Sequence, residues 1–419
     1  MRKMLSWTAA VLAAGIFAAL PAYSGSQPII QQVTQTTLCE NFQPMISGDG
    51  KKIVFLADCE IIPGSNADRN YEVFLYDIEN RSFVQITETA APKASNTPSI
   101  NQDGSLVAFR STGDLVPGKN KDGNPEIFVY AAKSKTLKQI TRTAPPAVNS
   151  GPSLSGDGKR IVFFSTAEFS EGENPGRKMQ AVLYESKSGR FKQLTHAPAA
   201  PAPTGIPGLP VSGVSLSWDG TKAIIVSSLD LAKGKNPDGA MQFFLYHTKT
   251  GSVDQVTHNT GRSEPGHSHG VPSLSEDGSK IAYLSTADSD HARHGEGNQA
   301  VFLLDTASGS ATQIAEAEKC QIQNVAMNGK GTLLSFAATC DFTGGNKDPG
   351  SPNMEVFVYD VEKKSFLQLT HTLRDFNHTP SVDRNGSRIA FGSDRDIHRG
   401  KNLDENSEIF LATLPRMKP

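Results

Sequence analysis

Short apolar runs recur along this chain and alternate with polar segments in a fixed order. In each unit a turn ending in Gly precedes an apolar run, a long loop rich in Gly, Asn and Asp, a second apolar run ending near Tyr, and a Gln-apolar-Thr triplet. One full copy extends from Pro98 to Thr141. Repeats of this length are typical of arrays, solenoids and propellers. The turn anchors are spaced by 53 to 62 residues: Asp49-Gly50, Asp103-Gly104, Asp157-Gly158, Asp219-Gly220, Asp277-Gly278, Lys330-Gly331 and Asn385-Gly386.

The apolar runs predict β-strands. A run such as Lys52 to Leu56 follows each turn anchor, and a run such as Glu72 to Tyr76 follows each long loop. Asp-Gly and Asn-Gly readily adopt the positive φ that a two-residue hairpin turn requires. We therefore predict four antiparallel strands per unit, which we call a, b, c and d, and no helix. Because a lone unit would expose its apolar faces, the units must stack, and four-stranded units around an axis form an all-β propeller.

The Gln-apolar-Thr triplets predict that the array closes into a ring of seven blades. One triplet, Gln32-Val33-Thr34, lies ahead of the first turn anchor, and the last unit ends after its strand c at Glu408 to Leu411. The N-terminal segment therefore supplies the strand d that the last blade lacks. We expect Ile29 to Thr34 to pair beside Glu408 to Leu411, because an open solenoid would gain nothing from such an arrangement.

The repeat resembles the TolB-like, or PD40 (WD40-like), propeller repeat. The resemblance covers about residues 29 to 414 and is carried by the PSLSxDG phrases at Pro152 to Gly158 and Pro272 to Gly278, together with the EIFxY-type third strand. It implies a propeller of exported TolB-like type. Only a few residues precede the first strand, so the resemblance does not extend to the N-terminal domain of TolB. The layout is also similar to that of seven-bladed oligogalacturonate lyases, which carry a His-bound metal.

The first residues have the features of a secretory signal peptide. Arg2 and Lys3 precede an apolar run from Leu5 to Leu20, and Ala22-Tyr23-Ser24 fits a small-x-small cleavage site. A short N-terminal anchor is the alternative, and no later run is long and apolar enough to span a bilayer. The predicted domains are a signal peptide at 1–24 and one propeller at 25–419, with blades at about 38–88, 94–142, 149–196, 212–258, 270–315, 322–371 and 378–414 plus 29–35.

The four cysteines form two pairs with the same spacing. Cys39 and Cys59 flank the first two strands of one unit, and Cys320 and Cys340 occupy the same places in another. Antiparallel neighbours bring those ends together, so we predict the disulfides Cys39–Cys59 and Cys320–Cys340 in a periplasmic or secreted protein. Zinc is the alternative, but the CxxC spacing of zinc sites is absent.

Charge gives little indication of the partner. The formal net charge is −2, and no basic run stands out. We therefore expect no nucleic-acid partner and no attraction to an anionic membrane. We expect a monomer whose partner is an envelope or extracellular protein or peptide.

The working face of the ring is predicted from its loops. The b–c and d–a connections share one face and are long, whereas the a–b and c–d turns on the other face are short, and function concentrates in long loops. The residues just before each strand a should surround the mouth of the central channel. Asx-type capping of the strand start is the alternative role for these amides and hydroxyls. The candidate binding residues are Asn41, Asn96, Asn149, His269, Gln323, Asn377 and His378, with Gln43, Thr97, Ser150, Ser212 and Asn324 beside them.

Two kinds of metal site come into question. The b–c loops repeat Gly-x-Asn-x-Asp, and Asn120, Asp122 and Glu126 could offer oxygen ligands to calcium, although Asx turns explain the same residues. His267 and His269 could bind a transition metal, but no third ligand is identifiable. We assign no cofactor, with calcium as the alternative.

The repeat contains no constellation of catalytic residues. We therefore predict a binding scaffold that engages a protein or peptide through its loop face. A metal-assisted polysaccharide lyase or hydrolase is the alternative.

Overall fold

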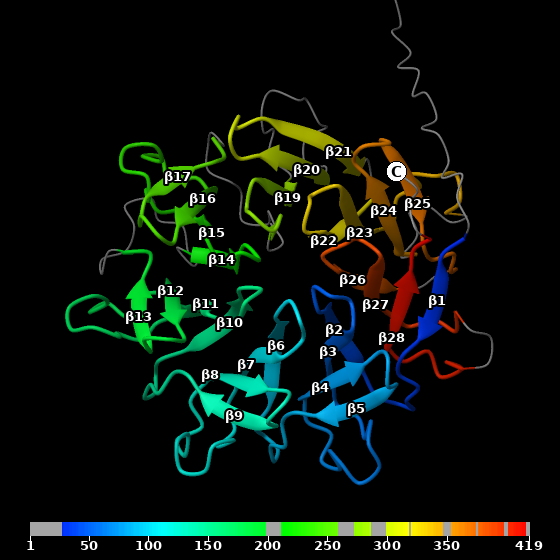
Figure 1. The fold of residues 1–419 in the computed structure, drawn as a ribbon, viewed down its shortest axis with the longest axis horizontal. Coiled ribbons are helices and arrows are strands. Elements are labelled where there is room, and N and C mark those ends of the chain that lie inside the picture. Colours follow the sequence, from blue (N-terminus) through cyan, green and yellow to red (C-terminus); the bar gives the residue numbers. More distant parts are fainter. Residues whose placement is uncertain are drawn as a thin grey trace, which may run out of the picture.

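The computed structural model describes residues 27–197, 211–258, 272–285, 299–317, 320–346, 353–373, 376–397 and 401–415. Within these ranges the chain forms seven four-stranded antiparallel sheets placed around a central axis (Figure 1). The predicted seven-bladed propeller is confirmed. None of the described segments is a helix that is long and apolar enough to cross a membrane. The predicted signal peptide at 1–24 lies outside the described residues.

Strands a and b form the inner half of every blade. Strand a lies nearest the axis (Figure 1) and comprises β2 (Asn41–Ile46), β6 (Ser95–Ile100), β10 (Asn149–Leu154), β14 (Val211–Leu216), β18 (Ser273–Leu274), β22 (Ile322–Met327) and β26 (Asn377–Val382). Strand b comprises β3 (Lys52–Ala57), β7 (Leu106–Ser111), β11 (Arg160–Ser165), β15 (Lys222–Ser227), β19 (Lys280–Ser285), β23 (Leu333–Ala338) and β27 (Arg388–Ser393).

Strands c and d form the outer half. Strand c comprises β4 (Glu72–Asp77), β8 (Glu126–Ala131), β12 (Gln180–Glu185), β16 (Gln242–His247), β20 (Gln299–Asp305), β24 (Glu355–Asp360) and β28 (Glu408–Thr413). Strand d comprises β5 (Ser82–Gln85), β9 (Thr136–Gln139), β13 (Arg190–Gln193), β17 (Val253–Gln255), β21 (Ala311–Ala317), β25 (Ser365–Gln368) and, in the last blade, β1 (Ile29–Gln32).

The N-terminal strand completes blade 7, as predicted. β1 pairs antiparallel with β28, so that Ile29 lies opposite Thr413 and Gln32 opposite Phe410. Beyond the strand, the amide of Val33 donates to the carbonyl of Ile409 at 2.7 Å. Figure 1 shows β1 and β28 side by side in this blade. The ring is therefore closed by backbone hydrogen bonds between the first and last strands of the chain.

The core lies between the blades. Both faces of strands b and c are covered, which explains why these strands are continuous apolar runs rather than alternating ones. Inside a blade, stacked rings join strand b to strand c, as in Phe109–Phe128, whose centroids are 5.9 Å apart, and Phe391–Phe410, at 5.7 Å. Burying a phenylalanine side chain contributes about 2–3 kcal/mol to folding. Because side chains of the neighbouring blade cover these rings, each blade is stable only when its neighbours are present.

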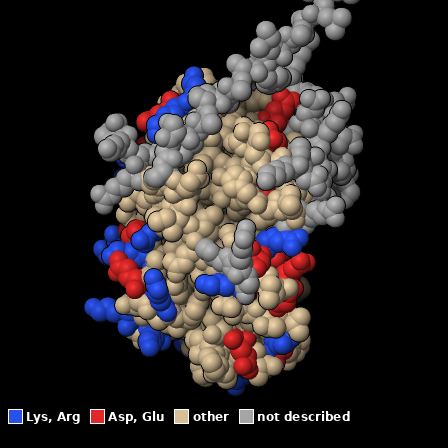
Figure 2. Space-filling view, turned by 90° about the vertical axis from the view of Figure 1, so that its right-hand side faces the viewer, with Lys and Arg blue, Asp and Glu red and all other residues tan. Residues whose placement is uncertain are grey.

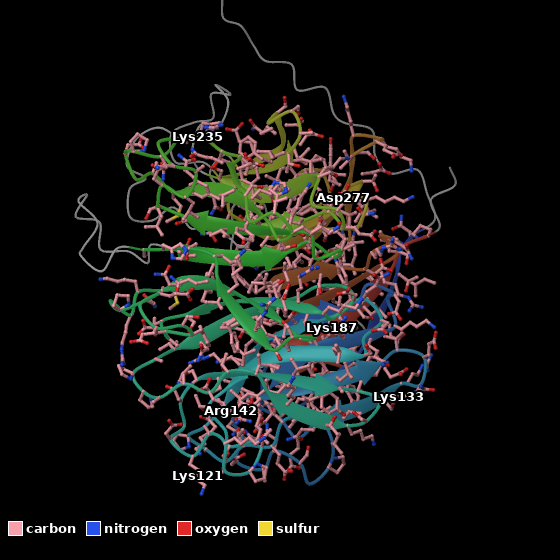
Figure 3. All side chains as sticks on the ribbon, turned by 60° about the vertical axis from the view of Figure 1, so that its left-hand side comes forward. Lys121, Lys133, Arg142, Lys187, Lys235 and Asp277 are labelled. Atoms are coloured by element: carbon pink, nitrogen blue, oxygen red, sulfur yellow. A yellow bond between two sulfur atoms is a disulfide. The ribbon has the colours of Figure 1, made fainter. Side chains whose placement is uncertain are left out.

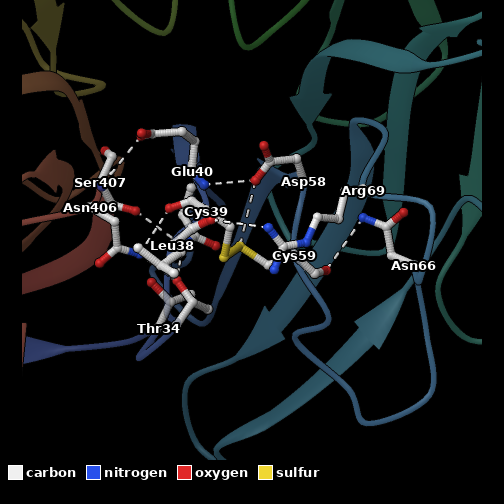
Figure 4. The surroundings of a disulfide bond; sticks show 12 residues. Thr34, Leu38, Cys39, Glu40, Asp58, Cys59, Asn66, Arg69, Asn406 and Ser407 are labelled. Atoms are coloured by element: carbon white, nitrogen blue, oxygen red, sulfur yellow. Dashed lines mark hydrogen bonds between the residues drawn. A yellow bond between two sulfur atoms is a disulfide. The ribbon is translucent and has the colours of Figure 1, made fainter. Parts of the chain in front are cut away.

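Both predicted disulfides are present. Cys39–Cys59 and Cys320–Cys340 have Cα–Cα distances of 5.7 and 5.4 Å, and each joins the start of a strand a to the end of its strand b. Figure 4 shows Cys39–Cys59 beside the seam between blades 1 and 7, where the amide of Glu40 donates to Asp58 and the Asn406 side chain donates to the Cys39 carbonyl. A cross-link over 20 residues typically stabilises a fold by about 3 kcal/mol.

The two faces of the ring carry different connections. Figure 3 shows Lys121 and Lys235 of the b–c loops, together with Arg142 after β9, on one face. Lys133 and Lys187 of the c–d turns and Asp277 of an a–b turn lie on the other face. We call these the loop face and the turn face. In the side view of Figure 2, acidic and basic side chains are interspersed around an uncharged area, with no extended surface of one sign on that side.

The a–b turns are joined to one another in a circle of backbone hydrogen bonds on the turn face. Each bond runs from an amide in one turn to a carbonyl in the next, at 2.6–3.0 Å, and together they cross all seven junctions. The bonds are Asp49 to Gln102, Gln102 to Gly156, Gly156 to Trp218, Asp219 to Glu276, Glu276 to Gly329, Gly329 to Arg384 and Arg384 to Gly48. This circle fixes the innermost turns in one plane.

Large side chains from this circle reach across the axis. A Cβ added at Gly48 or Gly156 would meet the Trp218 ring at 2.8 and 3.1 Å, although blades 1 and 4 lie on different sides of the ring. Arg384 of blade 7 forms a two-fold hydrogen-bonded ion pair with Glu276 of blade 5, with both bonds at 2.7 Å, and this pair leaves no room for a side chain at Gly329. Trp218 and the Glu276–Arg384 pair therefore lie across the turn end of the central channel.

A buried polar network joins each strand c to the following blade. Glu72, Glu126, Glu355 and Glu408 begin their strands and are almost fully buried. The Glu355 carboxylate accepts hydrogen bonds from Thr370, Thr372 and the Asn377 side chain of blade 7, the last at 3.3 Å. Burial raises the pKa of Glu72, Glu355 and Glu408, because removal from water outweighs the threonine donors that stabilise their charged forms.

The residue that begins strand c is glutamate in some blades and glutamine in others. It varies together with the residue that it faces in the next blade. Glu126, Glu355 and Glu408 each accept from an Asn at the start of the next strand a, namely Asn149, Asn377 and Asn41. Gln180 and Gln299 occupy the same place in blades 3 and 5, and the next strands a begin with the apolar Val211 and Ile322. A carboxylate has only acceptors and is bonded by the Asn donor in these three blades, whereas a glutamine carries its own donor. Glu72 is the exception, because the next strand a begins with Ser95 and the Glu72 carboxylate accepts from Thr87 and Thr89.

This joint variation predicts a coupled pair of substitutions. Asn377→Val should remove one donor from the buried Glu355 carboxylate and lower the free energy of unfolding by about 1–3 kcal/mol. Adding Glu355→Gln should recover most of that loss, because it recreates the pair found at Gln180 and Val211. Urea unfolding of both single variants and the double variant measures the coupling. Effects that simply add within about 0.5 kcal/mol would contradict the role assigned to the network.

Candidate functional site

The loop end of the central channel is the candidate site. The turn end is spanned by Trp218 and the Glu276–Arg384 pair, so the loop end is where a ligand can approach the innermost strands from solvent. This end is formed by the first residues of each strand a and the last residues of each strand b.

A bulge in strand a shapes the channel wall. The pairing of strands a and b shifts register between Phe42 and Met45, and at the same place in most of the other blades. Four bulge residues adopt a positive φ although they are not glycine, which non-glycine residues seldom do. They are Gln43 (51°), Thr97 (49°), Asn324 (53°) and Thr379 (46°). Gln43 and Asn324 are exposed, so these bulges leave polar side chains open to solvent at the start of the innermost strands, at a backbone cost that packing must offset.

Three of the predicted binding residues have a structural role, because they form buried hydrogen bonds between blades. The side chains of Asn41, Asn149 and Asn377 are fully buried, and each amide nitrogen donates to a carbonyl and to the buried glutamate of the preceding blade. They therefore join neighbouring blades. That they also contact a ligand stays a prediction. His269 lies outside the described residues.

Asn96 and Arg110 form a different arrangement at the same level of blade 2. They lie opposite each other in β6 and β7, and Arg110 donates from Nη1 to Asn96 Oδ1 at 3.3 Å. Arg110 Nε is buried without a partner, and no carboxylate faces this guanidinium in the described part of the chain. Burial lowers the pKa of Arg110. The corresponding residues of strand b in the other blades are uncharged: Leu56, Phe164, Val226, Leu284, Ala337 and Gly392. The site thus contains one half-buried cation without a counter-ion.

Gln323 holds the equivalent place in blade 6. It is partly exposed and lies opposite Ala337, next to the exposed Asn324. This pair can offer amide donors and acceptors to a ligand, which stays a prediction.

His378 is largely enclosed, although less so than Asn41, Asn149 and Asn377. Its Nδ1 lies 3.0 Å from Thr379 Oγ1, its Nε2 lies 3.0 Å from Ser407 Oγ, and Asp394 is 3.9 Å away. A Cβ at Gly392 would meet the ring at 2.3 Å, so glycine opposite His378 makes room for the imidazole. Burial lowers the pKa of His378 to about 4. The ring is therefore neutral at physiological pH.

The predicted calcium ligands take part in hydrogen bonds within the protein. Glu126 accepts from Thr141, Thr143 and Asn149. Asn120 uses its amide nitrogen to bond Gly113 and Asn124 across the b–c loop, while its Oδ1 has no partner. Asp122 is exposed and accepts from the Asn124 amide. Asx-type bonding thus explains Asn120 and Asp122, and calcium binding stays a prediction.

A group of potential metal ligands occurs at Cys39, Asp58 and Cys59. The two sulfur atoms are bonded to each other in the disulfide, which leaves the carboxylate without thiolate partners for a metal. Within the described residues this is the one group of three such ligands. His267 and His269 lie outside them.

Arg110 was missed by the sequence analysis, although a signal was present. It interrupts a position that is apolar or small in the other blades. Its meaning depended on a fact that the sequence does not contain, namely that no acidic side chain faces it.

The environment of His378 predicts a pH-dependent stability. Because its folded pKa, about 4, lies below the unfolded value, its contribution is complete above about pH 6.5 and is lost as the pH falls towards 4. The loss should reach roughly 3 kcal/mol. His378→Gln, which introduces the residue that blade 6 has at Gln323, should lack this dependence.

Urea unfolding of both proteins from pH 7.5 to 4.5 measures it. The buried glutamates have raised pKa values, so they favour folding as the pH falls, and they do so equally in both proteins. Parallel stability curves for wild type and variant would contradict the burial of a neutral His378.

No protein-family model matches the sequence, and no curated protein sequence is similar to it. Solved structures do match. An oligogalacturonate lyase from Vibrio parahaemolyticus aligns with a TM-score of 0.60 at 14% identity over 94% of this chain and 96% of its own. An oligogalacturonate lyase in complex with manganese aligns with a TM-score of 0.60 at 13% identity over 92% and 93%. TolB from Acinetobacter baumannii aligns over 77% of this chain and 64% of its own with a TM-score of 0.46 at 17% identity, and we base no argument on it. At these identities the likeness shows the propeller fold alone.

Proposed function

We propose that this protein is an exported binding scaffold that holds a protein or peptide segment at the loop end of its channel. The observation that carries the proposal is the half-buried Arg110, whose guanidinium lies beside strand a without a carboxylate partner. A cation in such a place is costly unless a ligand pairs with it. The polar bulge residues around the mouth and the absence of a catalytic constellation among the described residues support binding rather than catalysis.

The chemistry of Arg110 favours an anionic group on the partner. A guanidinium binds a carboxylate through two parallel hydrogen bonds, and this pairing is stronger in a partly desolvated site. An acidic side chain or a C-terminal carboxylate inserted at the mouth would satisfy Arg110, while exposed amides such as Asn324 could bond the peptide backbone.

The location of the partner follows from the disulfides. Cross-links of this kind persist in oxidising compartments, so we propose a periplasmic or extracellular protein as the partner. The TolB-like character of the repeat fits this proposal and remains part of it.

A metal-assisted lyase or hydrolase is the second candidate. One of the similar structures is an oligogalacturonate lyase with manganese, and Arg110 could also face a sugar carboxylate. Elemental analysis of the purified protein and an assay with polygalacturonate separate the two functions. Stoichiometric transition metal together with cleavage of the polymer would replace the scaffold proposal.

The scaffold proposal predicts a face-specific loss of binding. Arg110→Gln should reduce capture of the partner from an envelope extract at least about tenfold, because it removes a charge-assisted contact. Lys133→Gln removes the same charge from the turn face and should leave capture unchanged. Quantitative mass spectrometry of material bound to the immobilised wild type and both variants measures this. Equal recovery by all three proteins, or no enriched partner, would contradict the proposal.

A further inference from the structure

A second cleft lies between the outer strands of blades 3 and 4, with a volume of about 720 Å³. The end of blade 3, from Lys192 to His196, forms one wall. The b–c loop of blade 4 and Tyr246 of β16 form the other. Leu194, Leu229, Leu231 and Val253 give the cleft an apolar lining.

The cleft lies where blade 4 differs from blades 1, 3 and 6; blade 2, with Leu137 opposite Tyr130, also lacks their strand d Phe. In blades 1, 3 and 6 the Tyr near the end of strand c packs on a Phe of strand d, with ring centroids 4.7–5.0 Å apart. In blade 4 the residue opposite Tyr246 is Val253. The corresponding cleft between blades 7 and 1 is about 590 Å³, and there Phe83 forms part of the wall while Tyr76 does not. Val253 therefore presents a smaller side chain to Tyr246, which lines the cleft although it is buried.

The b–c loop beside Tyr246 also carries a smaller side chain than the same loop in blades 3 and 6. Leu231 occupies the place of Phe169 in blade 3 and Phe342 in blade 6. Each of those rings stacks on the strand d Phe, at 4.3 and 5.1 Å. Blades 3 and 6 thus fill with their own aromatic rings a space that blade 4 leaves vacant.

The polar groups of the cleft indicate which polar group an aromatic ligand would carry there. The Tyr246 hydroxyl is buried and has no hydrogen-bond partner in the described part of the chain. In blade 3 the equivalent Tyr184 hydroxyl accepts from Lys138 at 3.1 Å. Lys192 lies over the Tyr246 ring, with Nζ 5.4 Å from the centroid, much as Lys138 lies over Tyr184 at 5.8 Å, but the Tyr246 hydroxyl lacks the hydrogen bond. A buried hydroxyl without a partner requires an explanation.

Lys192 and Tyr246 can both reach one point. A Cβ built on Gly251 would lie 3.4 Å from Lys192 Nζ and 3.5 Å from Tyr246 Oη. An oxygen atom near that point would be within reach of both donors. Asp230, the acidic residue of the lining, already accepts the amides of Gly234, Lys235 and Asn236.

We propose that this cleft binds an aromatic ring that carries a carboxylate. The ring packs on Tyr246 in the place that Phe191 takes in blade 3. The carboxylate accepts from Lys192 Nζ and Tyr246 Oη beside Gly251. A free aromatic acid and a peptide with a C-terminal aromatic residue share this chemistry.

Binding of 3-phenylpropanoate to the full chain tests the proposal. Isothermal titration calorimetry should give a Kd of about 1 mM or lower, as expected for a ligand of this size. The amide of the same acid should bind about tenfold more weakly, because it lacks the charge that Lys192 pairs with. An acetylated Ala-Ala-Phe with a free carboxylate forms the peptide arm, and tighter binding of either compound identifies the source.

Two variants and their matched controls locate the site. Val253→Phe should abolish binding, because it supplies the ring that blade 3 carries, and Lys192→Gln should weaken binding about tenfold. Leu137→Phe and Lys138→Gln make comparable changes in strand d of blade 2 and should leave the Kd unchanged. The proposal is overturned if neither aromatic acid binds, or if binding survives both Val253→Phe and Lys192→Gln.

Discussion

The pairing of β1 with β28 is the contact on which the rest of the structure depends. Every blade buries apolar side chains against both neighbours, so an open array would leave two such faces in water. The two ends of the chain meet inside blade 7, where β1 and β28 are joined by backbone hydrogen bonds and not by a covalent link. Residues 33–40 carry the chain from β1 into blade 1, and the Glu408–Asn41 contact and the turn bond from Arg384 to Gly48 also join blades 7 and 1. The Cys39–Cys59 disulfide stiffens the blade 1 side of this junction.

Polar groups, rather than the apolar core, distinguish one junction from another. Apolar packing is similar between all blades, whereas the donor that faces each buried Glu or Gln differs. A blade inserted at the wrong junction would place an Asn beside a glutamine or leave a carboxylate facing Val211 or Ile322. Because an unpaired buried polar group costs about 1–3 kcal/mol, the network favours one order of blades. In a chain of similar repeats this is a physical reason for the correct neighbours to find each other.

The ring and its closure could be predicted because they depend on local patterns that recur. Asp-Gly turns, apolar runs and the displaced Gln32-Val33-Thr34 triplet each report backbone geometry, and the paired cysteines follow from hairpin register. The candidate site could not be predicted in the same way. Asn41, Asn149 and Asn377 look like channel-mouth residues in sequence, but the glutamates they bond belong to the preceding blade. The sequence does contain the pairing of Glu with Asn and of Gln with Val or Ile. The pairing can be interpreted only when the contact between neighbouring blades is known.

The blades differ at two kinds of position. At the first kind the differing side chain completes the packing of the fold, and at the second kind a polar group is left without a partner. Two residues before the a–b turn Gly, Trp218 and the Glu276–Arg384 pair fill space that Gly48, Gly156 and Gly329 leave, so variation there is compensated within the ring. Arg110 and Val253 have no such compensation in the described residues. The first leaves a guanidinium nitrogen without an acceptor, and the second lies in an apolar cleft beside a tyrosine hydroxyl that has no partner. A stable ring can carry both costs, because its closure and its circle of turn hydrogen bonds do not depend on either residue. Uncompensated variation on a self-sufficient scaffold is what selection for a ligand would leave behind, and the two cases lie apart from the turn circle, at the loop mouth and at the outer cleft.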